Sequence, residues 1–259
     1  MGISNENDQE LNQAQTNRRR LARNVLAIGA IAATAGLAGG CYKCFLKGTK
    51  IRTAQGERKV EELAIGDLLP TLFGGMRPIQ WIARYAHKKS DPTKSWARYA
   101  RPVRIARSAF APNVPHSDLF VTSWHALLLD DTLVPAGNLI NGTTITLYPA
   151  DEFDELEFFH VKFETHDVIY AEGAACETLL TVSETASNFA EYYRAYGAPK
   201  LEEVSCAPLL FYGGRRGQIK SRLRSAISPW FDCREKFDVI RDRLEEREIA
   251  LCEQMELLS

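Results

Sequence analysis

Between residue 44 and about residue 183, short runs of apolar and β-branched residues alternate with polar turns. The runs lie at 50–53, 65–69, 77–83, 102–105, 119–122, 143–147, 156–163 and 167–171. Runs of this length, separated by turns that contain Gly or Asn, are typical of antiparallel strands. The pattern therefore predicts a mainly β domain.

Two connecting stretches carry their own predictions. The pair Asn141-Gly142 precedes an alternating run and predicts a β-hairpin. Residues 84–101 are polar and basic, so we expect a long loop or an insertion there.

The pattern changes to a helical period in the last part of the chain, 184–259. Apolar residues at 219, 223 and 227 alternate with basic ones and predict an amphipathic helix over 217–227. A second stripe predicts a helix over 232–257, and it consists of Phe237, Ile240, Leu244, Leu251, Met255 and Leu258. Such a stripe packs on a core or on a partner helix, although the basic helix could also lie on a membrane surface.

The N-terminus has the composition of a targeting segment. Residues 1–24 are polar and then basic, which predicts disorder, and 25–42 form an apolar run rich in small residues. We expect this run to form an N-terminal apolar helix. A basic stretch directly before an apolar run is typical of a signal peptide or a signal anchor. We expect localisation at the cell membrane or export to the cell envelope or outside. The run could be cleaved, span the membrane or carry a lipid.

Composition excludes several classes of protein. The net charge of −1 over 259 residues gives no global attraction to nucleic acid, so no nucleic-acid partner is expected. The six cysteines are spaced irregularly, apart from the Cys41-x-x-Cys44 pair. That pair could be a redox or zinc pair, but no further ligands have the spacing that zinc requires. We therefore expect no metal and no cofactor.

Four motifs follow one another in the strand-rich region. They are Cys44-Phe-Leu-Lys-Gly48-Thr49, Val60-Glu-Glu-Leu63-Ala-Ile-Gly66-Asp67, Thr122-x-x-His125, and His160 followed by His166-Asp-Val-Ile-Tyr-Ala-Glu-Gly173. In this order they resemble the Hint domain, the self-processing module of hedgehog proteins and inteins, and its bacterial branch in particular. The resemblance covers 43–183. It implies a horseshoe of short antiparallel strands with pseudo-two-fold halves.

The resemblance also implies a reaction. Cys44 stands at the head of the domain, where its thiol could attack the carbonyl of Lys43 and exchange the peptide bond for a thioester. His125 matches the family's histidine and would protonate the leaving amide nitrogen. Thr122 matches the family's threonine and could hydrogen-bond the scissile peptide or stabilise the oxyanion.

The motifs alone do not decide which residue acts as the base or how the reaction ends. Either His160 or His166 could take the thiol proton, and position favours His160, although many relatives have an aspartate there. Splicing relatives end their last strand in His-Asn, whereas Gly173 is followed here by Ala-Ala-Cys-Glu. We therefore expect self-cleavage of the Lys43–Cys44 bond without splicing. The substrate would be the chain's own N-terminal segment, and water or a small nucleophile would resolve the thioester.

A second interpretation stays open. The chain could be a catalytically inactive Hint-fold module, anchored at the membrane through residues 25–42, that acts as a binding or interaction domain.

Overall fold

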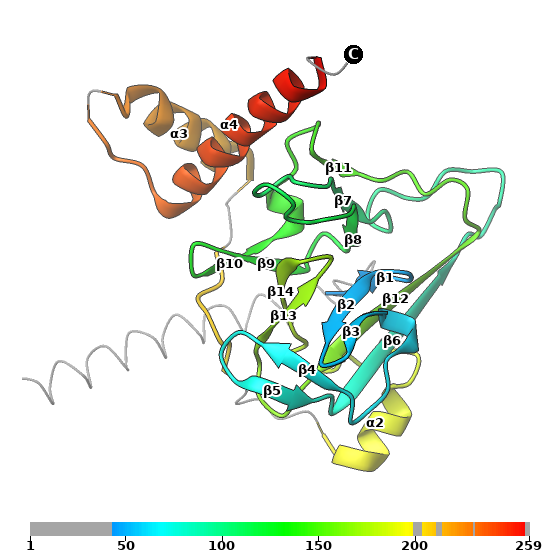
Figure 1. Cartoon of the computed structure of the whole chain (residues 1–259). Coiled ribbons are helices and arrows are strands. Elements are labelled where there is room, and N and C mark those ends of the chain that lie inside the picture. The colour runs from blue at the N-terminus through cyan, green and yellow to red at the C-terminus, as the bar shows by residue number, and fades with distance from the viewer. Residues whose placement is uncertain (1–42, 199–203, 211–213, 230, 257–259) are drawn as a thin grey trace, which may run out of the picture. The chain divides into compact units, whose positions relative to one another are not determined.

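The computed structural model of the chain describes residues 43–198, 204–210, 214–229 and 231–256 (Figure 1). The expected disordered N-terminus, the apolar segment at 25–42 with its predicted helix, and Cys41 lie outside these residues. Within the described part, no helix has the length and hydrophobicity needed to cross a membrane.

Two six-stranded sheets, both antiparallel, form the strand-rich part of the described chain. The first sheet has the order β11 (Ile145–Leu147), β7 (Val103–Ile105), β8 (Leu119–Val121), β1 (Phe45–Leu46), β12 (Glu155–Lys162) and β6 (Trp81–Lys88). The second has the order β10 (Thr132–Pro135), β9 (Ala126–Leu129), β14 (Ala174–Glu177), β13 (Val168–Ala171), β2 (Lys50–Thr53) and β3 (Gly56–Lys59). A separate hairpin joins β4 (Leu68–Thr71) and β5 (Gly75–Pro78), and short 3-10 turns lie at Val60–Glu62 and Ala136–Asn138.

The strand patterns follow from burial. In β2, Ile51 and Thr53 are buried while the two alternate residues are exposed, as expected for a strand with one face in the core. In β12 the buried residues are continuous from Phe158 to Lys162, because Phe158 packs in one hydrophobic cluster and Phe159 and Val161 pack in another, so that both faces of the strand are covered. The mainly β class predicted from the sequence is confirmed, whereas the horseshoe with pseudo-two-fold halves stays a prediction.

The loop expected at 84–101 is partly wrong. Strand β6 continues to Lys88, with His87 opposite Leu156. The apolar–polar alternation fades there, but the edge of the long strand β12 offers backbone groups that must be paired. The later part of the stretch is anchored by Trp96, which is buried and donates its indole N–H to the carbonyls of Ala150 and Phe153.

The hairpin expected at Asn141-Gly142 is also wrong. Strand β11 pairs with β7, where Ile145 lies opposite Ile105, and a 3-10 turn precedes the Asn-Gly pair. The side-chain oxygen of Asn141 accepts a hydrogen bond from the Ile145 amide at 2.9 Å and so caps a loop.

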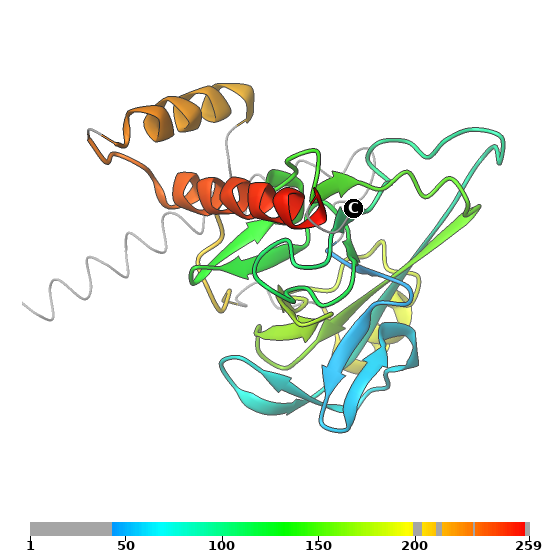
Figure 2. The same ribbon diagram turned by 45° about the horizontal axis from the view of Figure 1, so that its top comes forward.

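In the described residues, three helices follow the strands, which confirms that helices lie in the C-terminal part. Helix α2 (Phe189–Tyr196) places Tyr192 against Trp81, with ring centroids 5.6 Å apart. Helix α3 (Gly214–Ile227) and helix α4 (Lys236–Glu256) lie side by side (Figure 2). The predicted stripe enters the main core through its first half, since Phe237, Ile240 and Leu244 are all buried there.

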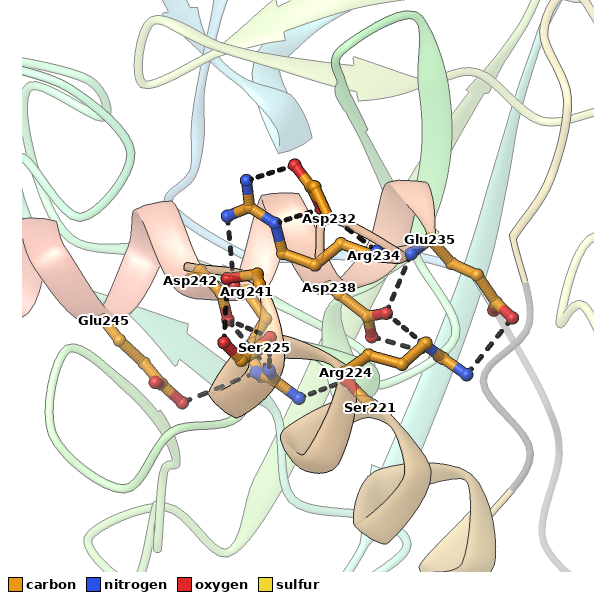
Figure 3. A network of polar contacts seen from close by, with 11 residues as sticks. Ser221, Arg224, Ser225, Asp232, Arg234, Glu235, Asp238, Arg241, Asp242 and Glu245 are labelled. Atoms are coloured by element: carbon orange, nitrogen blue, oxygen red, sulfur yellow. Dashed lines mark hydrogen bonds and ion pairs between the residues drawn. The ribbon is translucent and has the colours of Figure 1, made fainter. Parts of the chain in front are cut away.

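Ion pairs join α3 to the start of α4 (Figure 3). Asp238 is fully buried and accepts two hydrogen bonds from Arg224, at 2.5 and 3.2 Å. Arg241 of α4 reaches back to Ser225 at 2.7 Å. Charged and polar side chains therefore contribute to holding the two helices together, and Leu223 of α3 is 60% exposed.

Candidate active site

The peptide nitrogen of Cys44 is held by a threonine from the neighbouring strand. Phe45 of β1 lies opposite Val121 of β8, so the residues beside them, Cys44 and Thr122, are also adjacent. The Cys44 amide donates to Thr122 Oγ1 at 2.9 Å, and the Thr122 amide donates to the Cys44 carbonyl at 2.9 Å. The nitrogen of the Lys43–Cys44 bond therefore has a fixed side-chain partner.

His125 is placed by the same turn. Its amide donates to the Thr122 carbonyl at 3.0 Å, and its carbonyl accepts from Ala136 at 2.9 Å. The imidazole is fully buried, with ring centroids 4.3 Å from Phe45 and 4.8 Å from His160. Among the described residues, neither ring nitrogen has a hydrogen-bond partner.

Burial keeps that ring neutral. Desolvation, and then repulsion from His160, lowers the pKa of His125 well below its usual value. A neutral imidazole has one N–H to donate and one lone pair to accept a proton. Both nitrogens are available for proton transfer inside this site.

His160 lies in the same buried cluster, on β12. Its Nε2 is 3.2 Å from the carbonyl oxygen of Glu177, and because a carbonyl only accepts, the neutral ring carries its proton on Nε2. Nδ1 has no partner among the described residues and keeps its lone pair. Burial lowers the pKa of His160 to about 4.

The thiol itself is not activated by its surroundings. Cys44 is fully buried, and burial raises the pKa of its thiol well above the usual value. A neutral thiol must lose its proton to react, so the site needs a base. The lone pairs of His125 and His160 are the acceptors that this buried cluster offers.

Glu177 also belongs to the site, although the sequence did not predict a role for it. This residue ends β14, and its side chain is 1% exposed. One carboxylate oxygen accepts from the Ala126 amide at 2.7 Å, and the other from Lys43 Nζ at 2.9 Å. Burial alone would raise the pKa of Glu177, but Lys43 and then His166 outweigh burial and hold that pKa at about 2. No sequence motif marks this carboxylate, because Lys43 and Ala126 are 134 and 51 residues away from it in the chain.

His166 contacts Glu177 rather than the threonine turn. Its Nδ1 accepts from the Cys206 amide at 3.0 Å, and its Nε2 lies 3.6 Å from Glu177 Oε2. The structure thus joins the Cys44 backbone to Thr122, and through the turn from Thr122 to His125 it connects this pair to the neighbouring imidazoles of His125 and His160. His166 lies outside this group, because its Nε2 faces Glu177 Oε2, the same oxygen that pairs with Lys43.

One other group of side chains in the described residues has the composition of a metal site. The ligand atoms of Glu57, His116 and Glu172 lie within 4.8 Å of one another. However, the imidazole nitrogens already face the two carboxylates, at 2.7 Å from Glu57 and 3.6 Å from Glu172. We interpret this group as a hydrogen-bonded cluster around His116, and the expectation of no metal or cofactor stays a prediction.

Comparison with known proteins identifies the family. The Hint domain model matches residues 43–183, which is more than half of the chain, so the chain belongs to the Hint domain family. The family comprises domains of the autoprocessing type. No curated protein matches the chain significantly.

Several solved structures are similar over about half of this chain. The gp41-1 intein is 14% identical with a TM-score of 0.37, and the match covers 52% of this chain and 98% of the intein. A bacterial intein-like domain from Clostridium thermocellum is 16% identical with a TM-score of 0.36, covering 53% of this chain and 99% of that domain. A DnaB intein from Synechocystis sp. PCC 6803 is 8% identical with a TM-score of 0.36, covering 52% and 98%.

Proposed function

We propose that this chain cleaves its own Lys43–Cys44 bond by an N–S acyl shift at Cys44. The observation that carries the proposal is the hydrogen bond of 2.9 Å from the Cys44 amide to Thr122 Oγ1. It fixes the leaving nitrogen beside a buried cluster that contains two neutral imidazoles.

The acyl shift is an isomerisation and needs no co-reactant. The Cys44 thiol gives its proton to an imidazole lone pair, and Sγ bonds to the carbonyl carbon of Lys43. The carbon–nitrogen bond breaks as the nitrogen takes a proton from His125. This is the thiol's proton, which His125 receives directly or through the His160 ring, whose centroid lies 4.8 Å from that of His125. The low pKa of His125 makes its protonated form a strong acid, which suits a poor leaving group such as an amide nitrogen.

The second step consumes one nucleophile. Water attacks the thioester carbonyl, leaving Lys43 with a carboxylate and Cys44 with its thiol restored. We infer that splicing does not follow, because the residues directly after Gly173, Ala174–Glu177, form β14 and include no asparagine. The released piece would be residues 1–43. If the apolar run at 25–42 anchors the chain, release would detach the domain from a membrane.

The test is the size and the N-terminus of the purified chain. Wild type should yield a shorter product that begins with Cys44, and added hydroxylamine or thiol should accelerate its formation, since both attack thioesters. Cys44→Ala should stay full length. Cys176→Ala is the matched control, because Cys176 is equally buried but lies in β14 of the other sheet. A product that begins at another residue would point to a signal peptidase and contradict the proposal.

A second candidate is the inactive, membrane-anchored Hint-fold module. The burial that raises the pKa of Cys44 favours it, because a thiol that stays protonated is a poor nucleophile. Wild type that stays full length with hydroxylamine and with thiol would support this candidate instead.

A further inference from the structure

Lys43, the residue before the scissile bond, has a buried partner of opposite charge. Its ammonium lies 2.9 Å from Glu177 Oε2. The Lys43 side chain is 29% exposed, whereas the Glu177 side chain is 1% exposed. The carboxylate is therefore part of the protein interior, and the cation reaches in from the side of the segment that would be released.

The carboxylate is positioned by groups other than Lys43. The Ala126 amide holds Oε1 at 2.7 Å, and His166 Nε2 lies 3.6 Å from Oε2. Cys176, beside Glu177 on β14, is opposite Leu127 of β9, so the strand pairing fixes the backbone at this point. Lys43 Nζ donates its hydrogen bond to Oε2 from the side that these groups leave open.

We propose that Glu177 is the specificity-determining residue for the position before Cys44, and that it selects a cationic side chain there. This inference rests on the proposed self-cleavage. A buried carboxylate without a cation has lost its hydration and has no ion pair to compensate for that loss. A neutral residue at position 43 therefore leaves the charge of Glu177 unpaired. An acidic residue at 43 would be repelled.

Glu177 favours a cationic residue at position 43 because the ion pair fixes the position of the scissile peptide. The side chain held by Glu177 belongs to the residue whose carbonyl carbon Sγ attacks. The ion pair thus fixes one side of the scissile peptide, and Thr122 fixes the nitrogen on the other side. Holding both sides of a reacting bond lowers the entropic part of the barrier.

The experiment measures the rate of hydroxylamine-induced cleavage in full-length chains that differ at residue 43. Lys43→Arg should cleave within about threefold of wild type, because arginine also pairs with carboxylates. Lys43→Met should cleave at least about tenfold more slowly and Lys43→Glu about a hundredfold more slowly, as expected for a buried carboxylate left unpaired or repelled. Lys47→Met is the matched control, since Lys47 pairs with Glu157 at the surface.

Glu177→Gln separates specificity from a purely structural role. The amide keeps an oxygen for the Ala126 N–H but removes the charge. We expect it to slow cleavage of the chain that keeps Lys43. In the same background, Lys43→Met should change the rate by less than about threefold, because the charge that distinguishes the two side chains is gone. The double exchange Lys43→Glu with Glu177→Lys should recover at least about tenfold over Lys43→Glu alone.

Different failures point to different errors. If wild type cleaves and all residue-43 variants cleave at the same rate, the selection by Glu177 is wrong and self-cleavage stands. If Glu177→Gln slows every variant by one common factor, Glu177 is only structural.

If wild type does not cleave, the proposed function fails. The Lys43–Glu177 pairing is then tested in the Cys44→Ala chain by a double-mutant cycle of Lys43→Met and Glu177→Gln on the unfolding equilibrium. A coupling below about twofold overturns recognition of Lys43, and a larger one supports it.

Discussion

The buried histidine on β12 should make the stability of the uncleaved domain fall steeply in mild acid. Burial lowers the pKa of His160 from its ordinary value of 6.5 to about 4. The unfolded chain therefore binds a proton at a higher pH than the folded chain does. The stability that His160 contributes is fully present above pH 6.5 and is lost as the pH falls toward 4.

The size of the effect follows from the shift. A difference of about 2.5 pKa units corresponds to about 3 kcal/mol, at about 1.36 kcal/mol per unit. His160→Gln removes the titration and keeps an N–H that can donate to the Glu177 carbonyl. In that variant the free energy of unfolding should decline by about 3 kcal/mol less than in the parent between about pH 7 and pH 4.

The assay is urea unfolding of Cys44→Ala chains, which stay uncleaved, at a series of pH values. Tryptophan fluorescence reports the transition, because Trp81 and Trp96 are buried. His87→Gln is the matched control. Burial lowers the pKa of His87 too, but His87 is only half-buried, so its removal should flatten the profile much less. Parallel profiles for the parent and His160→Gln would refute the reasoning.

Substitutions at three further positions test the site and the fold. Thr122→Val removes the acceptor for the Cys44 amide and should slow cleavage by about tenfold or more, whereas Thr122→Ser should stay close to wild type; equal rates for both would contradict the assigned hydrogen bond. Phe45→Ala empties a fully buried position and should lower the free energy of unfolding by about 3–5 kcal/mol in urea titrations, so a loss below about 1 kcal/mol would mean that the ring is not in the core. Asp238→Asn weakens the charged contact with Arg224 and should cost about 2 kcal/mol and speed proteolysis between α3 and α4; unchanged proteolysis would show that other contacts hold the helices.

Alternation in the sequence predicts strands with one buried face, whereas β12, which is covered on both faces, was predicted as a short apolar run. Alternation identified β2, where only Ile51 and Thr53 are buried. It did not identify β9 and β10, where the run from 126 to 135 has little alternation and all four residues of Thr132–Pro135 are buried. A strand covered on both faces has no period of two to detect. The hairpin prediction at Asn141-Gly142 was wrong because the Asn side chain can also cap a loop.

The candidate site could be predicted only where its residues share a motif. Thr122 and His125 are close in sequence, and a single turn places both. Glu177 could not be found in this way, because its role depends on Lys43 and Ala126, which are 134 and 51 residues away in the chain. Strand register brings these groups together, and no local pattern encodes that register.

The ion pair between Lys43 and Glu177 also gives the proposed reaction a proton balance. When residues 1–43 depart, the cation leaves and the buried carboxylate stays. The pKa of Glu177 must then rise, since burial acts on it without the charge that had offset burial. The cleaved domain holds protons more tightly than the precursor does, so linkage makes acid favour the products and makes rejoining the two pieces harder as the pH falls.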